Sequence, residues 1–264
     1  MGFIIEKMKD IQNSPDTRNV PIKKVGIKNL QYPVKVLDRS SSLQPTVAKI
    51  NMYVDLPHNY KGTHMSRFLE ILNQYHGKIA VIEIAGMLKK MQEYLDAETA
   101  HLEMSFPYFI TKQAPVSKAE AVMDYQCSFD ASLSGKDFDL IYQVAAPVTM
   151  LCPCSKEISE YGAHNQRSTV TVSIRTKELI WFEEIIDIIE DNVSSPVYAL
   201  LKRSDEKAVT ENAYDKAAFA EDVVRDIAVI LNKDKRVLWY RVETENMESI
   251  HNHNAYAMVE SEEV

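Results

Sequence analysis

The sequence predicts an α+β protein whose chain is organised as two successive halves. Several runs of residues alternate between apolar and polar side chains, which is typical of strands with one buried face. Between these runs, apolar residues recur at the spacing of a helix face. After a turn at residues 134–137 the order of strand, loop, helix, helix, strand, strand begins again. Together these observations favour an internal repeat that is built from antiparallel strands and pairs of helices.

The composition excludes several classes of protein. With 264 residues, of which 45% are hydrophobic and 26% charged, the chain matches a soluble globular protein of one large or two smaller domains. No stretch approaches the roughly 20 apolar residues of a membrane span. The N-terminus has no secretory pattern, so we expect a cytoplasmic protein without a membrane partner. A net charge of −8 argues against nucleic acid as the main partner.

The first part of the chain contains an arm and the first half of the repeat. Residues 1–45 hold four of the ten prolines and no sustained period, so we interpret them as an extended N-terminal arm with one short strand near residues 23–27. The first half covers residues 46–134. We expect it to contain a strand at 46–56, helices at 67–75 and 78–97 that are separated at Gly77, and strands at 102–110 and 121–133.

The second half covers residues 135–264. We expect strands at 138–146 and 170–174, a helix at 182–189, a loop at 202–211, a helix at 217–231, and strands near 236–244 and 254–259. The loops of the two halves are also similar, because in residues 57–67 and 153–167 a Pro is followed by Gly, His and Arg, the last three at the same spacing. If this likeness reflects a duplication, the first copy has lost its cysteines. The alternative is a chance likeness, because few positions are compared.

One loop combines two cysteines with a histidine. Cys152 and Cys154 are separated by one residue, and His164 follows ten residues later. Thiolate and imidazole groups suit zinc-like or iron-like ions. These residues supply at most three ligands, which favours a catalytic metal over a closed structural site. The alternative is free cysteines at a strand end beside a surface histidine. Cys127 lies on the apolar side of a strand and is interpreted as a core residue.

Further groups for such a site lie elsewhere in the second half. Two histidines, His251 and His253, are spaced so that both could point to one side of an extended segment. A polar turn with exposed histidines is the alternative interpretation. The acidic candidates are Asp205, Glu206, Glu211 and Glu221. Carboxylates on a helix surface are usually only solvated, so Glu221 by itself is a weak candidate.

Four longer segments carry a specific resemblance. They read D-I-Q-N-S-P-D-T-R-N-V-P-I-K-K-V-G-I-K-N at residues 10–29, L-C-P-C-S-K-E-I-S-E-Y-G-A-H-N-Q-R-S at 151–168, Y-A-L-L-K-R-S-D-E-K-A-V-T-E at 198–211 and S-I-H-N-H-N-A-Y at 249–256. Along essentially its whole length, the chain resembles the prokaryotic GTP cyclohydrolases of type IB. The resemblance implies a tandem tunnelling fold of two ββααββ-like halves, with antiparallel sheets and helices on one face, in a homotetramer.

The same resemblance implies an activity and a cofactor. The family hydrolyses GTP with water to formate and 7,8-dihydroneopterin triphosphate, the first step of folate-type pterin biosynthesis, which leads to tetrahydrofolate. The reaction takes place at a divalent metal ion. Ligands of the Cys, His and carboxylate types suit manganese, iron and zinc alike, so the residues do not select one of them.

The functional residues of the family match individual positions of this sequence. Cys152, His164 and Glu206 match the metal ligands, although which of the two cysteines holds the metal stays open. Glu221 resembles the glutamate that anchors the guanine ring. Cys154, His251 and His253 match positions near the reacting carbon and are the catalytic candidates. Four loop cations are candidates for the triphosphate, namely Lys61, Arg67, Lys202 and Arg203.

Three other functions remain open from the sequence. An archaeal-like cyclohydrolase would yield a pterin with a cyclic phosphate. A nitrile reductase of queuosine synthesis would share the fold and would attack a nitrile through a cysteine. A nonenzymatic assembly module would use Cys152, Cys154 and His164 to close a structural metal site.

Overall fold

The computed structural model describes residues 10–12, 14–40, 42–75 and 81–262, without the side chains of residues 81 and 82. The chain forms two compact units. Unit 1 comprises the described residues of Met1–Leu37, Pro45–Met104 and Asp130–Asp139, and unit 2 comprises those of Asp38–Gln44, Ser105–Phe129 and Leu140–Val264. The predicted division at residues 45 and 134 stays a prediction. The predicted break at Gly77 lies outside the described residues.

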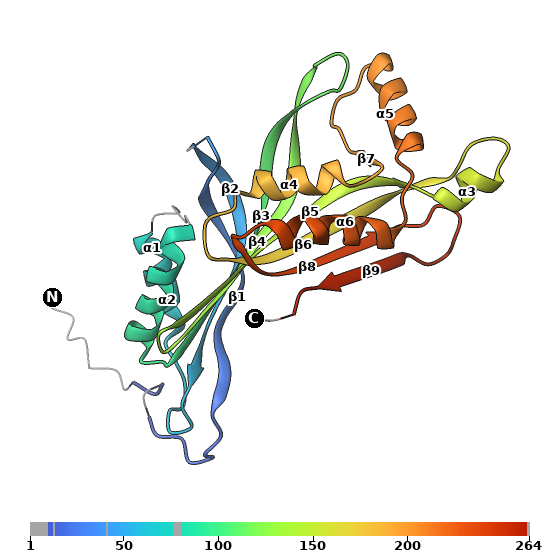
Figure 1. Ribbon diagram of the computed structural model, residues 1–264. Helices are drawn as coiled ribbons and strands as arrows, with labels where there is room; N and C mark the ends of the chain where they lie inside the picture. Colours follow the sequence, from blue (N-terminus) through green and yellow to red (C-terminus); the bar gives the residue numbers. More distant parts are fainter. Residues whose placement is uncertain (1–9, 13, 41, 76–80, 263–264) are drawn as a thin grey trace. The chain divides into compact units, whose positions relative to one another are not determined.

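Unit 1 combines long strands with two helices (Figure 1). Its elements are β1 (Ile22–Leu37), β2 (Leu43–Leu56), α1 (Met65–Gln74), α2 (Val81–Leu95) and parts of β3 (Thr99–Gln113), β4 (Glu120–Ser134) and β5 (Asp137–Leu151). Every second residue of β2 from Ala48 to Val54 is buried, as the alternation predicts. Strand β1 is longer than the short strand expected near residues 23–27. It approaches β2 so closely that a Cβ at Gly26 would lie 1.9 Å from the carbonyl oxygen of Met52.

Unit 2 contains the rest of the chain. Its further elements are α3 (Pro153–Ile158), β6 (Asn165–Thr176), α4 (Phe182–Asp191), β7 (Ser195–Pro196), α5 (Arg203–Asp215), α6 (Ala220–Lys233), β8 (Val237–Asn246) and β9 (Ala255–Glu260). Hydrogen-bonded neighbours follow the order β1-β2-β3-β4-β5-β6-β8-β9, and β7 pairs with β5. The strands β5, β6, β8 and β9 pair antiparallel.

The register of these antiparallel strands brings one end of each of β5, β6, β8 and β9 to the same end of the sheet. Leu151 pairs with Asn165, Ser168 pairs with Asn246, and Asn246 pairs with Ala255. The last residues of β5 and β8 therefore lie beside the first residues of β6 and β9. We call this the loop end of the sheet, because it carries the connections at residues 152–164 and 247–254.

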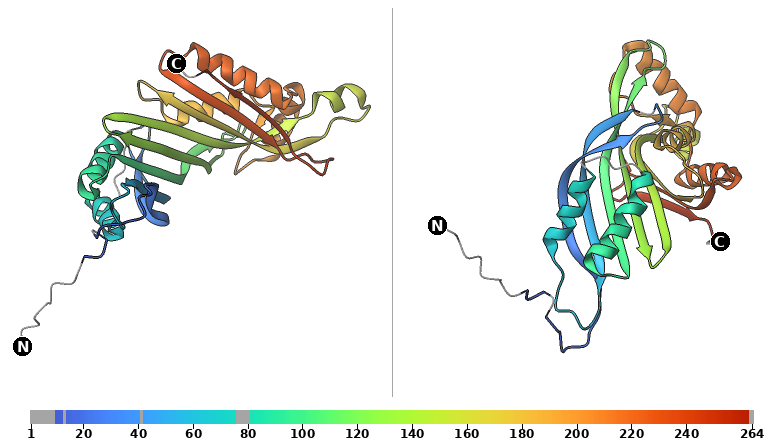
Figure 2. Two further views of the ribbon diagram at one scale, coloured as in Figure 1. Left: turned by 90° about the horizontal axis from the view of Figure 1, so that it is seen from below. Right: turned by 90° about the vertical axis from the view of Figure 1, so that its left-hand side faces the viewer.

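Helices α4 and α6 cover one face of this part of the sheet (Figures 1 and 2). Apolar stripes on both helices are buried, as their helical spacing predicts. Phe182 of α4 is a centre of this core. Its ring lies 5.3 to 6.5 Å, centroid to centroid, from four aromatic rings, those of Phe106, Tyr108, Phe129 and Tyr142. No helix in the described part of the chain is long and apolar enough to cross a membrane.

The order of elements confirms two ββααββ halves, β1-β2-α1-α2-β3-β4 and β5-β6-α4-α6-β8-β9, with α3, β7 and α5 added in the second. Two local expectations are wrong. Residues 57–64 connect a strand to a helix, whereas residues 152–164 connect two strands, so the two loops are not equivalent. The segment expected as a loop at residues 202–211 lies almost entirely in α5, which begins at Arg203.

Candidate active site

The Cys/His loop, residues 152–164, leaves the loop end of the sheet between β5 and β6. The backbone N–H of Cys152 donates to the carbonyl oxygen of His164 at 3.1 Å, so the first and last residues of the loop are directly joined. This bond continues the antiparallel pairing of the two strands by one more step. Two of the three residues predicted as metal ligands, Cys152 and His164, are therefore held together at the base of the loop.

Ser155 connects the same two residues through its side chain. Its hydroxyl donates to the carbonyl oxygen of Cys152 at 3.1 Å and accepts the backbone N–H of His164 at 3.2 Å. The N–H of Ser155 also donates to the sulfur of Cys152 at 3.4 Å. Cys152 is the N-cap of the short helix α3, which begins at Pro153, a residue suited to the first helical position. Cys154 lies inside α3 and is exposed.

The imidazole of His164 is hydrogen-bonded to a side chain of strand β6. Its Nδ1 lies 3.1 Å from Oε1 of Gln166, and Nε2 of Gln166 donates to Oε1 of Glu248 at 3.2 Å. Gln166 is buried on β6, and Glu248 follows β8. The backbone of Met247 donates to the carbonyl oxygen of Arg167 at 3.0 Å, which ties this segment to β6.

Two more predicted groups belong to the loop end of the sheet. The backbone of Ala218 donates to the carbonyl oxygen of Leu151 at 3.2 Å, so helix α6 begins beside the end of β5. Glu221 is exposed in the first turn of α6. His251 and His253 lie in the connection between β8 and β9, where both are exposed and their rings stack with centroids 5.2 Å apart.

Glu206 is positioned by its neighbour Asp205, which is fully buried at the start of α5. The Asp205 carboxylate accepts the backbone N–H groups of Val116 and Ser117 at 2.8 and 2.7 Å, and the hydroxyl of Ser117 at 2.6 Å. It also accepts the N–H of Lys202 at 2.8 Å. Burial raises the pKa of Asp205, but these hydrogen bonds outweigh it and hold the pKa well below its usual range. The start of α5 is thus fixed to the β3–β4 hairpin, while Glu206 itself is exposed.

The opposite end of α5 faces α3. The ammonium of Lys156 lies 4.4 Å from the centroid of the Tyr214 ring and donates to the Tyr214 carbonyl oxygen. Glu206 and Tyr214 are eight residues apart, which corresponds to about 12 Å along a helix axis. Lys202 and Arg203 are exposed next to Glu206. The remaining cation candidates lie in unit 1, where Lys61 is exposed and Arg67 donates to the carbonyl oxygen of Tyr94 at 3.0 Å.

The donor set at the Cys/His loop fits a divalent metal ion. A thiol and an imidazole at the base of one loop are a common ligand pair for zinc and iron. Within the residues that the structure describes, no group of three His, Cys, Asp or Glu side chains lies close enough together to hold an ion. The structure brings Cys152 and His164 together and places Glu206 elsewhere on unit 2, so this ligand set stays a prediction.

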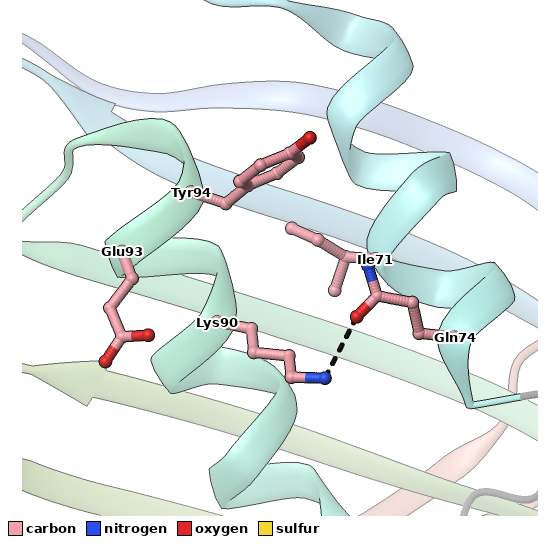
Figure 3. Close-up of a pocket in the computed structure, with 5 residues that line it drawn as sticks. All are labelled: Ile71, Gln74, Lys90, Glu93 and Tyr94. Atoms are coloured by element: carbon pink, nitrogen blue, oxygen red, sulfur yellow. Dashed lines mark hydrogen bonds between the residues drawn. The ribbon is translucent and has the colours of Figure 1, made fainter.

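A pocket of about 250 Å³ lies between α1 and α2 of unit 1 (Figure 3). It is lined by Ile71, Gln74, Lys90, Glu93 and Tyr94. Lys90 donates to Oε1 of Gln74 at 2.9 Å across it. None of the residues predicted for the site is among its lining residues. We interpret the pocket as space between two surface helices.

Ser155, Gln166 and Glu248 are not among the site residues predicted from the sequence. A signal for Gln166 exists, because Gln166 and Ser168 occupy the face of β6 on which Val170 and Val172 are buried. Polar residues at buried strand positions need hydrogen-bond partners and often serve a site. Ser155 and Glu248 carry no comparable signal, because their roles depend on contacts with residues distant in the sequence.

The fold is shared with solved structures of unrelated sequence. A hyperthermostable mutant of urate oxidase from Bacillus sp. TB-90 is similar with a TM-score of 0.54 at 10% identity, covering 91% of this chain and 98% of that one. A uricase from Bacillus fastidious has a TM-score of 0.53 at 9% identity, covering 93% and 94%. The chain is therefore a tunnelling-fold protein, which confirms the predicted fold class.

Sequence comparison identifies the particular family. The model of the type I GTP cyclohydrolase FolE2 family matches residues 8–257. GTP cyclohydrolase FolE2 of Geotalea uraniireducens is 56% identical over 253 residues, covering 96% of this chain and 93% of that protein. The protein of the same name from Nitrosococcus oceani is 57% identical over 255 residues, covering 97% and 96%. The chain belongs to the type I GTP cyclohydrolase FolE2 family, and the resemblance seen in the sequence is confirmed.

Proposed function

We propose that this protein is a GTP cyclohydrolase that hydrolyses GTP to formate and 7,8-dihydroneopterin triphosphate for folate-type pterin biosynthesis. Membership of the FolE2 family over nearly the whole chain supports this activity. The structural observation that best supports this activity is the backbone hydrogen bond that joins Cys152 to His164 at the loop end of the sheet. The family match does not favour the cyclic-phosphate product, the nitrile reductase or the nonenzymatic module.

Cys152, His164 and Glu206 would hold the divalent metal ion. A thiolate, an imidazole and a carboxylate make three protein ligands, which is the number that leaves a position open for water or substrate. When bound there, the ion would act as a Lewis acid and lower the pKa of water. Manganese, iron and zinc all suit this ligand set. Cys152 is preferred over Cys154 because its backbone is joined to His164.

Glu221 would select guanine. Its carboxylate can accept hydrogen bonds from N1–H and the 2-amino group of the base. Adenine has neither donor and would leave the carboxylate oxygens without partners, which is unfavourable once water is excluded. The position of Glu221 in the first turn of α6, beside the end of β5, supports this role.

His251 and His253 would carry protons during opening of the imidazole ring of guanine. Histidine titrates near neutral pH, so it can both accept and donate a proton under working conditions. Cys154 is the third group proposed near the reacting carbon. Lys61, Arg67, Lys202 and Arg203 are proposed to bind the triphosphate, because phosphate oxygens are bound by cationic side chains.

The protein is further proposed to be a cytoplasmic homotetramer. Strand β9 is the last strand in the order of hydrogen-bonded neighbours, and Tyr256 and Met258 on it are 60% and 48% exposed. An edge strand with exposed apolar residues is a ready site for pairing with another chain. This supports association of identical subunits, which native mass spectrometry would count directly.

The activity is tested by incubating the purified protein with GTP and Mn²⁺. We expect release of formate and, after oxidation, the fluorescence of a pterin. The mass of the product distinguishes the open triphosphate from a cyclic phosphate. Absence of both formate and pterin from metal-loaded protein would contradict the proposal.

A further inference from the structure

We propose that Gln166 is a positioning residue for His164 and that Glu248 in turn orients Gln166. Together they hold the His164 imidazole in the tautomer that has its proton on Nδ1 and a free lone pair on Nε2. This inference rests on the proposed role of His164 as a metal ligand. Gln166 lies within the segment 151–168, but neither the sequence motifs nor the family resemblance gave a role to it or to Glu248.

The three side chains form a continuous relay. Nδ1 of His164 lies 3.1 Å from Oε1 of Gln166, and Nε2 of Gln166 lies 3.2 Å from Oε1 of Glu248. Gln166 is 7% exposed, whereas His164 and Glu248 are half-buried at the two ends of the relay. The relay therefore runs from the Cys/His loop, through the sheet, to the segment that follows β8.

The donor and acceptor of each hydrogen bond in the relay follow from the chemistry of Glu248, the last of the three residues. An ionised carboxylate only accepts hydrogen bonds, so Glu248 must face the amide nitrogen of Gln166. The amide oxygen of Gln166 is then directed at His164 and can only accept. Nδ1 of His164 must donate, so it carries the proton of the neutral ring. Nε2 consequently keeps the lone pair with which a neutral imidazole binds a metal.

The backbone around the relay is fixed on both sides. Gln166 pairs with Met150 in the β5–β6 ladder, and the N–H of Met247 donates to the carbonyl oxygen of Arg167. A buried amide costs free energy unless it is hydrogen-bonded, and here each end of the amide has a partner. Partners of this kind orient the ligand ring and contribute to metal affinity in many metal sites.

The inference is tested by measuring the dissociation constant for Mn²⁺ alone on the metal-free protein, by titration calorimetry. Gln166→Leu removes both hydrogen bonds at similar volume. We expect the affinity to fall about 10- to 100-fold, the usual effect of losing such a partner. The thermal unfolding of the metal-free variant is recorded in parallel, so that lost folding is recognised separately from lost metal binding.

Gln143 provides a matched control. It lies on the neighbouring strand β5, half-buried, and its amide also makes two side-chain hydrogen bonds, to Ser128 and Ser173 at 3.1 Å each. Gln143→Leu therefore disturbs the same sheet in the same way without touching His164. We expect its affinity for Mn²⁺ to equal that of the unmodified protein. An equal loss in both variants would overturn the inference, because the effect would then belong to the sheet in general.

Exchanging the amide at position 166 with the carboxylate at position 248 gives a second test. Gln166→Glu alone sets two carboxylates against each other, and we expect weak binding of Mn²⁺. Combined with Glu248→Gln, the new carboxylate at position 166 accepts from both His164 and the new amide, so His164 still donates through Nδ1, while the bond between residues 166 and 248 forms again with donor and acceptor exchanged. We expect the double variant to regain most of the affinity. Failure of the double variant to improve on the single one would overturn the inference, even if Gln166→Leu does not fold.

His164→Ala separates this inference from the function on which it rests. If His164→Ala loses Mn²⁺ while Gln166→Leu binds it normally, the positioning role is wrong and the ligand role stands. If His164→Ala binds Mn²⁺ normally, the ligand role itself is wrong, and the inference falls with it. Loss of affinity in both, with recovery in the exchanged pair, supports the relay as described.

Discussion

Asp205 shows how one buried side chain fixes the position of a residue beside it. Its carboxylate accepts four hydrogen bonds, three from the β3–β4 hairpin and one from Lys202. A carboxylate with this many donors is stabilised in its charged form even when buried. The neighbouring Glu206, in the first turn of α5, thereby has a defined position. Helix α5 itself buries few side chains, so without Asp205 little else would fix the position of the exposed Glu206.

Asp205→Asn should destabilise unit 2 in a pH-dependent way. Because the native pKa lies below the ordinary value of 3.8, the carboxylate contributes stability above pH 3.8 that is lost as the pH falls through the native pKa. We expect the unmodified protein to be clearly more stable than the variant at neutral pH, and the difference to shrink in strong acid. Urea unfolding at several pH values measures this. A difference that grows on acidification would contradict the assigned pKa direction.

The two cysteines of the Cys/His loop are expected to differ. Cys152 is joined to His164 through its backbone, whereas Cys154 is exposed in α3. We expect Cys152→Ala to lose the bound metal and formate release. Cys154→Ala should keep the metal while losing activity, which is the result expected for a group near the reacting carbon. Metal content by mass spectrometry and formate release separate the two roles, and a metal-replete, active Cys152→Ala protein would remove its assignment.

At the scale of elements, helix α4 is attached to the sheet by its buried apolar stripe, which includes Phe182, and by a partly buried ion pair. Phe182 contacts four aromatic rings of the core. The ammonium of Lys112 lies 2.6 Å from the carboxylate of Glu190, with both side chains 14% exposed, and Tyr125 donates to the same carboxylate. After α4 the chain passes through Val197 before it reaches α5, which carries Glu206. The carbonyl oxygen of Val197 accepts a hydrogen bond from Lys112 at 3.0 Å.

Phe182→Ala should cost about 3–5 kcal/mol of the free energy of unfolding, as for other buried aromatic residues. Phe109→Ala is the matched control, because Phe109 is an aromatic residue of the same unit that is 38% exposed. We expect the control to change stability by much less. Urea unfolding followed by circular dichroism measures both variants. Equal losses would show that the aromatic contacts around α4 are not a centre of the core.

The sequence predicted the elements whose own residues carry a period. Strand β2 and helices α4 and α6 are examples, because one of their faces is continuously buried. Helix α5 was missed because only Asp205 and Ala213 are buried on it, so no apolar stripe exists. Strand β1 was underestimated because most of its residues are exposed or half-buried, and its place depends on the close approach of Gly26 to β2.

The candidate site could be predicted only in part, because residue patterns reveal relations within one segment and not contacts between distant segments. Cys152 and His164 lie within one loop, so their spacing in the sequence indicated a common site. The relay through Gln166 to Glu248 depends on the pairing of β6 with β8, which residue patterns do not reveal. The roles of Glu221, His251 and His253 came from the family resemblance, and the structure adds only that they lie toward the loop end of the sheet.

At the scale of the whole molecule, we propose that subunits share the metal site. Glu206 lies in the first turn of the helix whose last turn contacts the Cys/His loop, so in one chain it lies about two turns, or about 12 Å of helix axis, from that contact. A Glu206 from a neighbouring subunit would complete the ligand set.

This proposal predicts complementation between inactive variants. Cys152→Ala and Glu206→Ala should each be inactive alone. When the two are unfolded together and refolded as a mixture, some sites would combine an intact Cys152 with an intact Glu206 from another subunit. We expect formate release to return in the mixture. If mixed tetramers form, as shown by native mass spectrometry, and stay inactive, both ligands come from the same chain.

The hydrogen bond between Cys152 and His164 also has a consequence for how this family can vary. Because the loop is closed at its base, the spacing of thiol and imidazole does not depend on how many residues lie beyond Ser155. Ile158 and Tyr161, in the part of the loop beyond Lys156, are 84% and 95% exposed, so we expect changes there to leave the base of the loop in place. Insertions and deletions there could create new surfaces during evolution while the chemistry at the base is inherited unchanged.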